Sequence, residues 1–196
     1  MKKLLAVTIL SALVFGAVAV NAEDADSLTP KEQIIKQIIQ KNYNYDATGV
    51  LKALKNNDKD VISLFIASGY DPNITILKMP AIYWAIKLKK PDIVEKLLDA
   101  GVDPNQEVNG KSLMAHAIST ENVDIVKSLL KHGAKVNDMS AGKSLLTLAV
   151  SKKSEEISNL LINAGANIDE TSLNKALKLN NSTLKDLILT NYKKQD

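Results

Sequence analysis

Two histidines, His116 and His132, carry the only imidazoles in this sequence, and imidazole is the group that most often serves as a general base and as a metal ligand. They fall on different expected helices, and the sequence contains no H-E-x-x-H zinc motif. It also has no cysteine, no glycine-rich phosphate loop and no G-x-S-x-G nucleophile motif. We therefore expect no enzyme activity, no metal site and no cofactor, and we expect both histidines in ordinary structural positions.

The residues best suited to contact another protein form an apolar stretch that leads to the only tryptophan. Residues 74–79, ITILKM, are followed closely by Tyr83 and Trp84. Exposed aliphatic and aromatic side chains gathered in this way supply much of the binding energy of protein interfaces. Burial is the other interpretation, in which Tyr83 and Trp84 fill the space between neighbouring helices. The sequence leaves both interpretations open.

A regular repeat determines which elements must position these side chains. Glycines recur at equal intervals, at positions 69, 101, 133 and 165, and each follows an apolar segment: VISLFIASG, IVEKLLDAG, IVKSLLKHG and ISNLLINAG. A fixed period of about 33 residues is typical of stacked helix pairs, in which every pair buries its apolar face on its neighbours. The low aromatic content, 4%, suits the thin layers between such helices.

One period, residues 110–137, shows how each helix pair is built. Ser112 can cap a short first helix through its hydroxyl, and Gly133 supplies the left-handed turn that ends the second. The second helix carries apolar residues three and four positions apart, which places them on one face. These residues are Ile125, Val126, Leu129 and Leu130.

This segment resembles an ankyrin repeat, whose pattern runs from a Gly through T-P-L-H-x-A to a second helix and a final G-A-D-V-N. The match is carried by Gly110, Ser112, Met114, Ala117, Asn122, Ile125, Val126, Leu129, Leu130, Gly133, Ala134, Val136 and Asn137. The resemblance covers residues 30–191 and implies an all-α solenoid of stacked helix-turn-helix repeats with short β-hairpin-like fingers. We expect one ankyrin-repeat domain, 30–192, with an N-terminal half-repeat at 30–41 and helix pairs at about 48–68, 80–100, 112–132, 144–164 and 171–191.

The three expected fingers are residues 70–79, 102–111 and 134–143. The two terminal junctions are five residues shorter, so we expect no finger there. The family's histidine, which ties neighbouring repeats, is replaced at every position, which predicts that those hydrogen bonds are lost. Its replacements are Leu51, Tyr83, Ala115, Thr147 and Asn174. A helix-capping hydroxyl is expected at Thr48, Ser112, Ser144 and Thr171 but not at Pro80.

In ankyrin proteins the partner usually contacts the fingers and the concave face of the first helices. The resemblance therefore implies a protein-binding site rather than a catalytic one. By position, the residues expected at this site are Ile74, Ile76, Leu77, Met79, Tyr83, Trp84, Glu107, Val108, Asn109, Lys111, Ser119, Thr120, Met139, Ser140, Lys143, Ser151 and Lys152.

The N-terminal segment predicts export. Residues 1–22 contain two lysines, an apolar run and small residues that suit cleavage between Ala22 and Glu23. An uncleaved membrane anchor is the alternative, but the run is short for a span. Residues 23–29 then form an acidic linker, and residues 193–196 form a C-terminal tail. We expect a periplasmic protein, or alternatively a secreted one, with no stable membrane insertion after cleavage.

The charged residues argue against nucleic acid as a partner. Residues 1–22 hold two of the 25 basic residues and none of the 22 acidic ones, so the remaining chain has a formal net charge of only +1. Every basic residue is Lys, and Arg is the residue that reads phosphates and guanine bidentately. We expect a protein partner and a monomeric chain.

Exported bacterial ankyrin-repeat proteins of this size resemble two functional classes. One is an accessory factor that supports an envelope protein, such as a stress-defence enzyme. The other is an immunity-type inhibitor of a toxin delivered to the periplasm. A secreted effector that binds a host protein is a further alternative. The sequence does not separate these classes.

Overall fold

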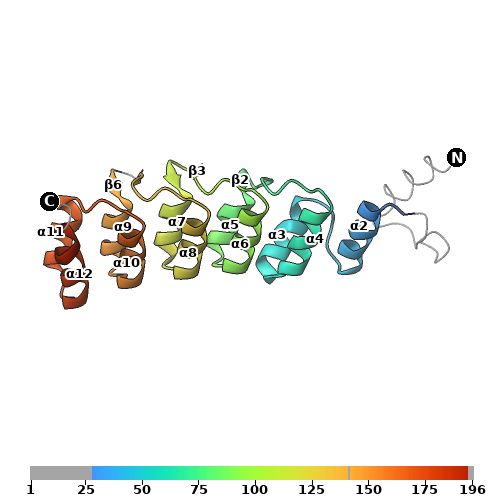
Figure 1. Ribbon diagram of the computed structural model, residues 1–196. Helices are drawn as coiled ribbons and strands as arrows, with labels where there is room; N and C mark the ends of the chain where they lie inside the picture. Colours follow the sequence, from blue (N-terminus) through green and yellow to red (C-terminus); the bar gives the residue numbers. More distant parts are fainter. Residues whose placement is uncertain (1–27, 141, 194–196) are drawn as a thin grey trace. The chain divides into compact units, whose positions relative to one another are not determined.

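The computed structural model describes residues 28–140 and 142–193 (Figure 1). In this part of the chain, eleven helices and three short antiparallel strand pairs follow one another, which confirms the expected all-α repeat fold with hairpin fingers. The expected signal segment, 1–22, its cleavage site at Ala22 and Glu23, and residues 194–196 of the expected tail lie outside the described residues. None of the described helices is long and apolar enough to cross a membrane.

The chain divides into two compact units, the first ending at Ala81 and the second beginning at Ile82. In the first unit α2 packs on α4, and α3 packs on α4. The finger of this unit is the strand pair β1–β2, in which Ile76 lies opposite Met79. The elements are α2 (Pro30–Gln40), α3 (Ala47–Asn56), α4 (Lys59–Ala67), β1 (Thr75–Ile76) and β2 (Met79–Pro80).

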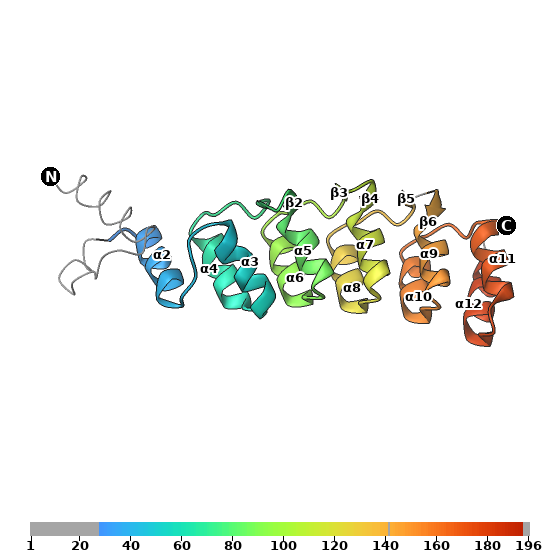
Figure 2. The same ribbon diagram turned by 180° about the vertical axis from the view of Figure 1, so that it is seen from behind.

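The second unit contains two fingers, which project from the same edge in both views (Figures 1 and 2). Helix α7 packs on α8 and α9, and α9 packs on α10 and α11. Helix α5 (Ala81–Lys87) begins at the boundary between the units. The other elements are α6 (Pro91–Asp99), β3 (Glu107–Val108), β4 (Lys111–Ser112), α7 (Leu113–Thr120), α8 (Val123–Lys131), β5 (Met139–Ser140), β6 (Lys143–Ser144), α9 (Leu145–Ser151), α10 (Glu155–Asn163), α11 (Glu170–Lys178) and α12 (Ser182–Tyr192).

Small residues at one repeated position allow the helices to approach closely. One alanine in each first helix is buried almost completely, and the second helices contribute branched residues such as Ile93, Ile125 and Ile157, each with no exposed surface. An alanine has no side-chain entropy to lose and leaves room for such branched neighbours, so thin layers still pack densely. The repeated alanines are Ala53, Ala85, Ala117, Ala149 and Ala176.

The free backbone N–H groups at the starts of the helices donate hydrogen bonds mainly to side chains that lie nearby in the sequence. Ser112 and Ser144 cap α7 and α9 as expected, each accepting a hydrogen bond from the backbone N–H three residues later. Thr48 and Thr171 are not caps, and this expectation was wrong. At both junctions that lack a finger, an aspartate two residues earlier is the N-cap instead, Asp46 for α3 and Asp169 for α11.

The turn between repeats requires a left-handed backbone, and Asn42 provides it where the later repeats use glycine. Its φ is 65°, and the glycines at 69, 101, 133 and 165 have φ values from 79° to 91°. Asparagine is the non-glycine residue that adopts this conformation most readily. The half-repeat therefore ends in the same way as the full ones.

Candidate protein-binding surface

The three fingers share one geometry, which determines which side chains can reach a partner. In β3–β4, Val108 lies opposite Lys111, and the turn between them passes through Asn109 and Gly110, both with positive φ. In β5–β6, Ser140 lies opposite Lys143. Because successive side chains of a strand point to opposite sides, the first residue of each finger's first strand faces solvent and the second does not.

Exposed side chains on the fingers include two large apolar ones. Leu77 is 71% exposed and Met139 is 62% exposed, although large apolar side chains are normally buried. Met79 and Ile74 are partly exposed. Polar residues at the exposed positions of the second unit's fingers are Glu107, Asn109, Lys111 and Lys143.

Three residues expected at the binding surface are buried, and the expectation of a surface role for them was wrong. Ile76, Val108 and Ser140 are 3%, 4% and 6% exposed. They recur at the same interval as the glycines and occupy the same place in the three fingers, at the second residue of the first strand. There the alternation of the strand turns the side chain inward. These residues hold each finger on its repeat.

Tyr83 and Trp84 lie on the exposed side of α5 and are each partly exposed. The Tyr83 ring meets the His116 ring edge to face at a centroid distance of 5.0 Å, and it meets Trp84 at 5.7 Å. His116 Nε2 lies 2.9 Å from the Val108 carbonyl oxygen of the finger that precedes its helix. Tyr83 therefore fills space between two repeats, and both aromatic rings retain surface that a partner can contact.

Polar residues at the C-terminal ends of the first helices use their hydroxyls within their own helix. Ser119 donates to the Ala115 carbonyl at 2.8 Å, and Ser151 donates to the Thr147 carbonyl at 2.6 Å. Thr120 likewise donates to a carbonyl three residues earlier. Lys152, also expected here, pairs with Glu121 of the preceding repeat at 3.0 Å. Ser119 and Lys152 are exposed, whereas Thr120 and Ser151 are partly exposed.

Neighbouring repeats of the second unit are joined by asparagines rather than by the family's histidine. Asn105 accepts a hydrogen bond from the Lys135 N–H at 2.9 Å and donates to the Gly133 carbonyl at 3.4 Å. Asn137 makes the same two bonds one repeat later, to Asn167 N–H and the Gly165 carbonyl. The sequence contained this signal as two asparagines separated by one repeat interval.

The expected loss of all hydrogen bonds at the histidine position was wrong for Thr147. Its hydroxyl donates to the Asp169 carboxylate of the following repeat at 3.2 Å. Asp169 lies four residues after Gly165, at the position that Asn137 holds one repeat earlier. One inter-repeat bond therefore persists where the family pattern has been replaced.

The opposite side of the second unit, formed by the second helices, is joined by ion pairs. Lys127 pairs with Glu156 at 2.9 Å, and Lys131 pairs with Glu95. Glu95, Asp99 and His132 each direct one possible ligand atom into a space where these atoms lie within 4.8 Å of one another. Lys131 already neutralises Glu95, and His132 Nε2 lies 3.1 Å from Asp99. The cluster therefore serves as a link between α6 and α8.

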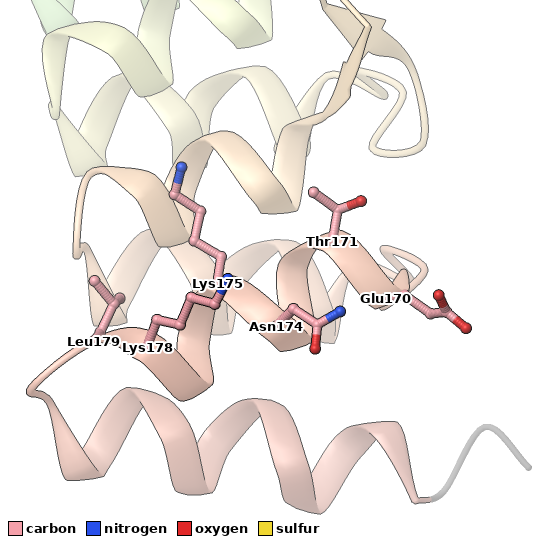
Figure 3. Close-up of a pocket in the computed structure, with 6 residues that line it drawn as sticks. All are labelled: Glu170, Thr171, Asn174, Lys175, Lys178 and Leu179. Atoms are coloured by element: carbon pink, nitrogen blue, oxygen red, sulfur yellow. The ribbon is translucent and has the colours of Figure 1, made fainter.

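Sequence reasoning missed an open pocket of about 550 Å³ on α11 (Figure 3). Six residues connect α10 to α11, whereas thirteen connect α8 to α9, and no strand lies between α10 and α11. The lining side chains are those of one face of this helix, namely Glu170, Thr171, Asn174, Lys175, Lys178 and Leu179. The shorter junction was visible in the sequence, but it predicted only a missing finger.

Residues 82–172 match the model of the ankyrin repeat family in three copies. With the stacked helix pairs and the fingers of this segment, the match shows that residues 82–172 are ankyrin repeats. Ankyrin repeats are protein-interaction scaffolds, so a protein partner is indicated. A comparison with curated proteins found no match.

Proposed function

We propose that this chain is an exported scaffold that holds another protein against its fingers and the exposed side of its first helices. The observation that carries the proposal is the exposure of Leu77 and Met139, at 71% and 62%, on two different fingers. One repeat interval from Leu77 stands the polar Asn109, and the positions equivalent to Met139 are Glu107 and Thr75, so repeat packing does not require an apolar side chain at either place. Large apolar side chains that a partner covers are the usual anchors of an interface, and the fingers are where ankyrin repeats contact their partners.

Export is part of the proposal and rests on the sequence of residues 1–22. Two lysines, an apolar run and small residues before Glu23 are the elements of a cleaved signal. The partner would then be a periplasmic or envelope protein, which this chain assists as an accessory factor. N-terminal sequencing of the protein recovered from the periplasm should begin at Glu23. A sequence beginning at Met1 would contradict cleavage.

Single substitutions on the fingers test the binding surface. A tagged chain should capture a partner from a periplasmic extract, and Leu77→Asp or Met139→Asp should weaken that capture by about tenfold or more, as loss of an interface anchor does. Asn159→Asp is the control, because Asn159 is exposed on α10, a second helix that belongs neither to the fingers nor to the first helices. All three variants should unfold at nearly the wild-type temperature.

The captured protein distinguishes the candidate functions. If both finger variants capture the same protein as well as the wild type does, the fingers are not the binding surface. If the captured protein is a stress-defence enzyme whose activity or stability rises on binding, the accessory function is supported. If it is a toxin that loses activity on binding, the chain is an immunity-type inhibitor instead.

A further inference from the structure

One partly exposed side chain stands immediately before the repeated alanine in each first helix of the second unit. These four residues, which we call the first-helix row, come from α5, α7, α9 and α11 in turn and are Trp84, His116, Leu148 and Lys175. Helix α7 packs on α9, and α9 packs on α11, while Tyr83 of α5 contacts His116 of α7. Neighbouring members of the row therefore come from neighbouring helices.

The chemistry of the row changes along the unit. It begins with an indole, an imidazole and a leucine side chain, and it ends with the ammonium group of Lys175. Lys175 opens onto the α11 pocket, where Lys178 lies one turn further along the helix. The row therefore has an apolar part and a basic end.

The two lysines of the pocket are available to an anionic group. Neither forms an ion pair with any residue in the described part of the chain, whereas Lys127, Lys131 and Lys152 are all paired. Glu170, the only acidic residue of the pocket, lies at the opposite end of α11 from Lys178 and points away from it (Figure 3). The helix dipole favours lysines at this end of α11. No strand lies between α10 and α11, and the side chains of both lysines border the open pocket.

The spacing of the row defines what would fit it. Packed helices lie about 8–10 Å apart, and an extended chain advances about 3.3 Å per residue. About three residues of an extended chain therefore span the distance from one first helix to the next. We propose that the first-helix row binds an extended segment of a partner protein with apolar side chains about three residues apart and a carboxylate about three residues beyond the last of them.

This inference rests on the proposed function and specifies its partner. Apolar side chains of the segment cover Trp84, the exposed part of His116 and Leu148, and its carboxylate pairs with Lys175 and Lys178. The carboxylate also fixes the direction in which the segment lies, because the two ends of the row differ in charge. A lysine or arginine at that position of the segment would be repelled.

Selection from a library of displayed random peptides, long enough to span the whole row and panned against the purified chain, tests the inference. The enriched peptides should share apolar residues about three positions apart and an Asp, a Glu or a terminal carboxylate about three positions beyond them. A synthetic copy of the most enriched peptide, made without tryptophan, should change the fluorescence of Trp84, the only tryptophan in the chain. Titration of that signal gives the affinity.

Charge reversal supplies the decisive comparison. Lys175→Glu combined with Lys178→Glu should weaken the peptide at least tenfold, and the same peptide with its carboxylate replaced by an amide should lose as much affinity on the wild type. Lys185→Glu combined with Lys193→Glu changes the net charge equally at α12 and should leave the affinity within twofold. Circular dichroism of both double variants should show the wild-type helix content.

Three outcomes overturn the inference. They are enriched peptides without the carboxylate, peptides bound equally well by the variant with both pocket lysines reversed, and a library that yields no peptide. If Met139→Asp abolishes capture of the partner protein while reversal of the pocket lysines has no effect, the scaffold function stands and the basic end of the row is not used. If neither change affects capture, both proposals fail.

Discussion

The hydroxyl of Thr147 donates a hydrogen bond to the carboxylate of Asp169 at 3.2 Å, so the buried side of α9 is tied to the residue that caps α11. The same carboxylate oxygen accepts the Ser172 N–H at 2.6 Å. Although burial raises the pKa of Asp169, hydrogen bonds from Ser172, Ser144 and Thr147 lower it more, and the net shift is downward. One side chain therefore caps a helix and joins two repeats.

Replacing Asp169 should separate the contribution of its hydrogen bonds to stability from that of its negative charge. Asp169→Ala removes the cap and the bond to Thr147, and it should cost about 1–2 kcal/mol of unfolding free energy. Asp169→Asn retains a side-chain oxygen that can accept both bonds, and it should cost clearly less. Urea unfolding followed by circular dichroism measures both changes. Equal losses in the two variants would mean that the charge, and not the hydrogen bonding, stabilises this junction.

The asparagine bridges should stabilise the loops locally. Asn105→Ala leaves the Lys135 N–H without its acceptor, so that amide should exchange with solvent faster, whereas the Asn167 amide should not change. Asn137→Ala should give the reverse pattern. Each variant should lose about 0.5–1.5 kcal/mol, the usual net value of such hydrogen bonds. Hydrogen exchange measured residue by residue checks this, and Asn159→Ala, exposed on α10, serves as the control.

Adjacent residues of the first finger should respond oppositely to the same substitution. Ile76→Asp places a carboxylate at a position that is 3% exposed and should cost about 2–4 kcal/mol of stability. Leu77→Asp, at a position that is 71% exposed, should change stability by less than about 0.5 kcal/mol. Thermal unfolding of the two single variants distinguishes them. Similar losses in both would show that the finger is core throughout.

The repeat and its helix ends could be predicted because their causes are local in the sequence. Gly133 was expected in a left-handed turn and has a positive φ. Ser112 was expected to cap α7 and does so. In each case the residue type at one position indicates the backbone conformation or the helix end found there. The constant interval between repeats then imposes the same requirement again along the chain.

Features that depend on a neighbouring element were not predictable in this way. The inward direction of Val108 arises in a strand of two residues, too short to show an alternating pattern. Asp46 replaces Thr48 as the cap of α3, a helix that no finger precedes in the described chain. The open pocket on α11 likewise follows from what is missing beside it. Each of these features results from the packing of two elements, so the residue type at one position does not predict it.

The imidazole of His132 joins the ends of α8 and α6. Its Nδ1–H donates to the Ser128 carbonyl at 2.8 Å, which leaves Nε2 facing Asp99 at 3.1 Å. The pKa of His132 is raised, chiefly by the Ser128 hydrogen bond and, against the effect of burial, by Asp99 and Glu95. Folding therefore favours the protonated, positively charged form of His132.

Stability should consequently fall as the pH rises from about 6 to 8. A histidine with a raised pKa stabilises the fold fully below its unfolded value of about 6.5, and this contribution is lost as the pH passes the folded value. Because Asp99 is exposed, the loss should stay below about 1 kcal/mol. His132→Gln should flatten the dependence of the unfolding free energy on pH, and Asp99→Asn should reduce its slope. Glu156→Gln removes an ion pair from the same side without touching an imidazole and should leave the slope unchanged. An unchanged slope in His132→Gln would show that another group titrates.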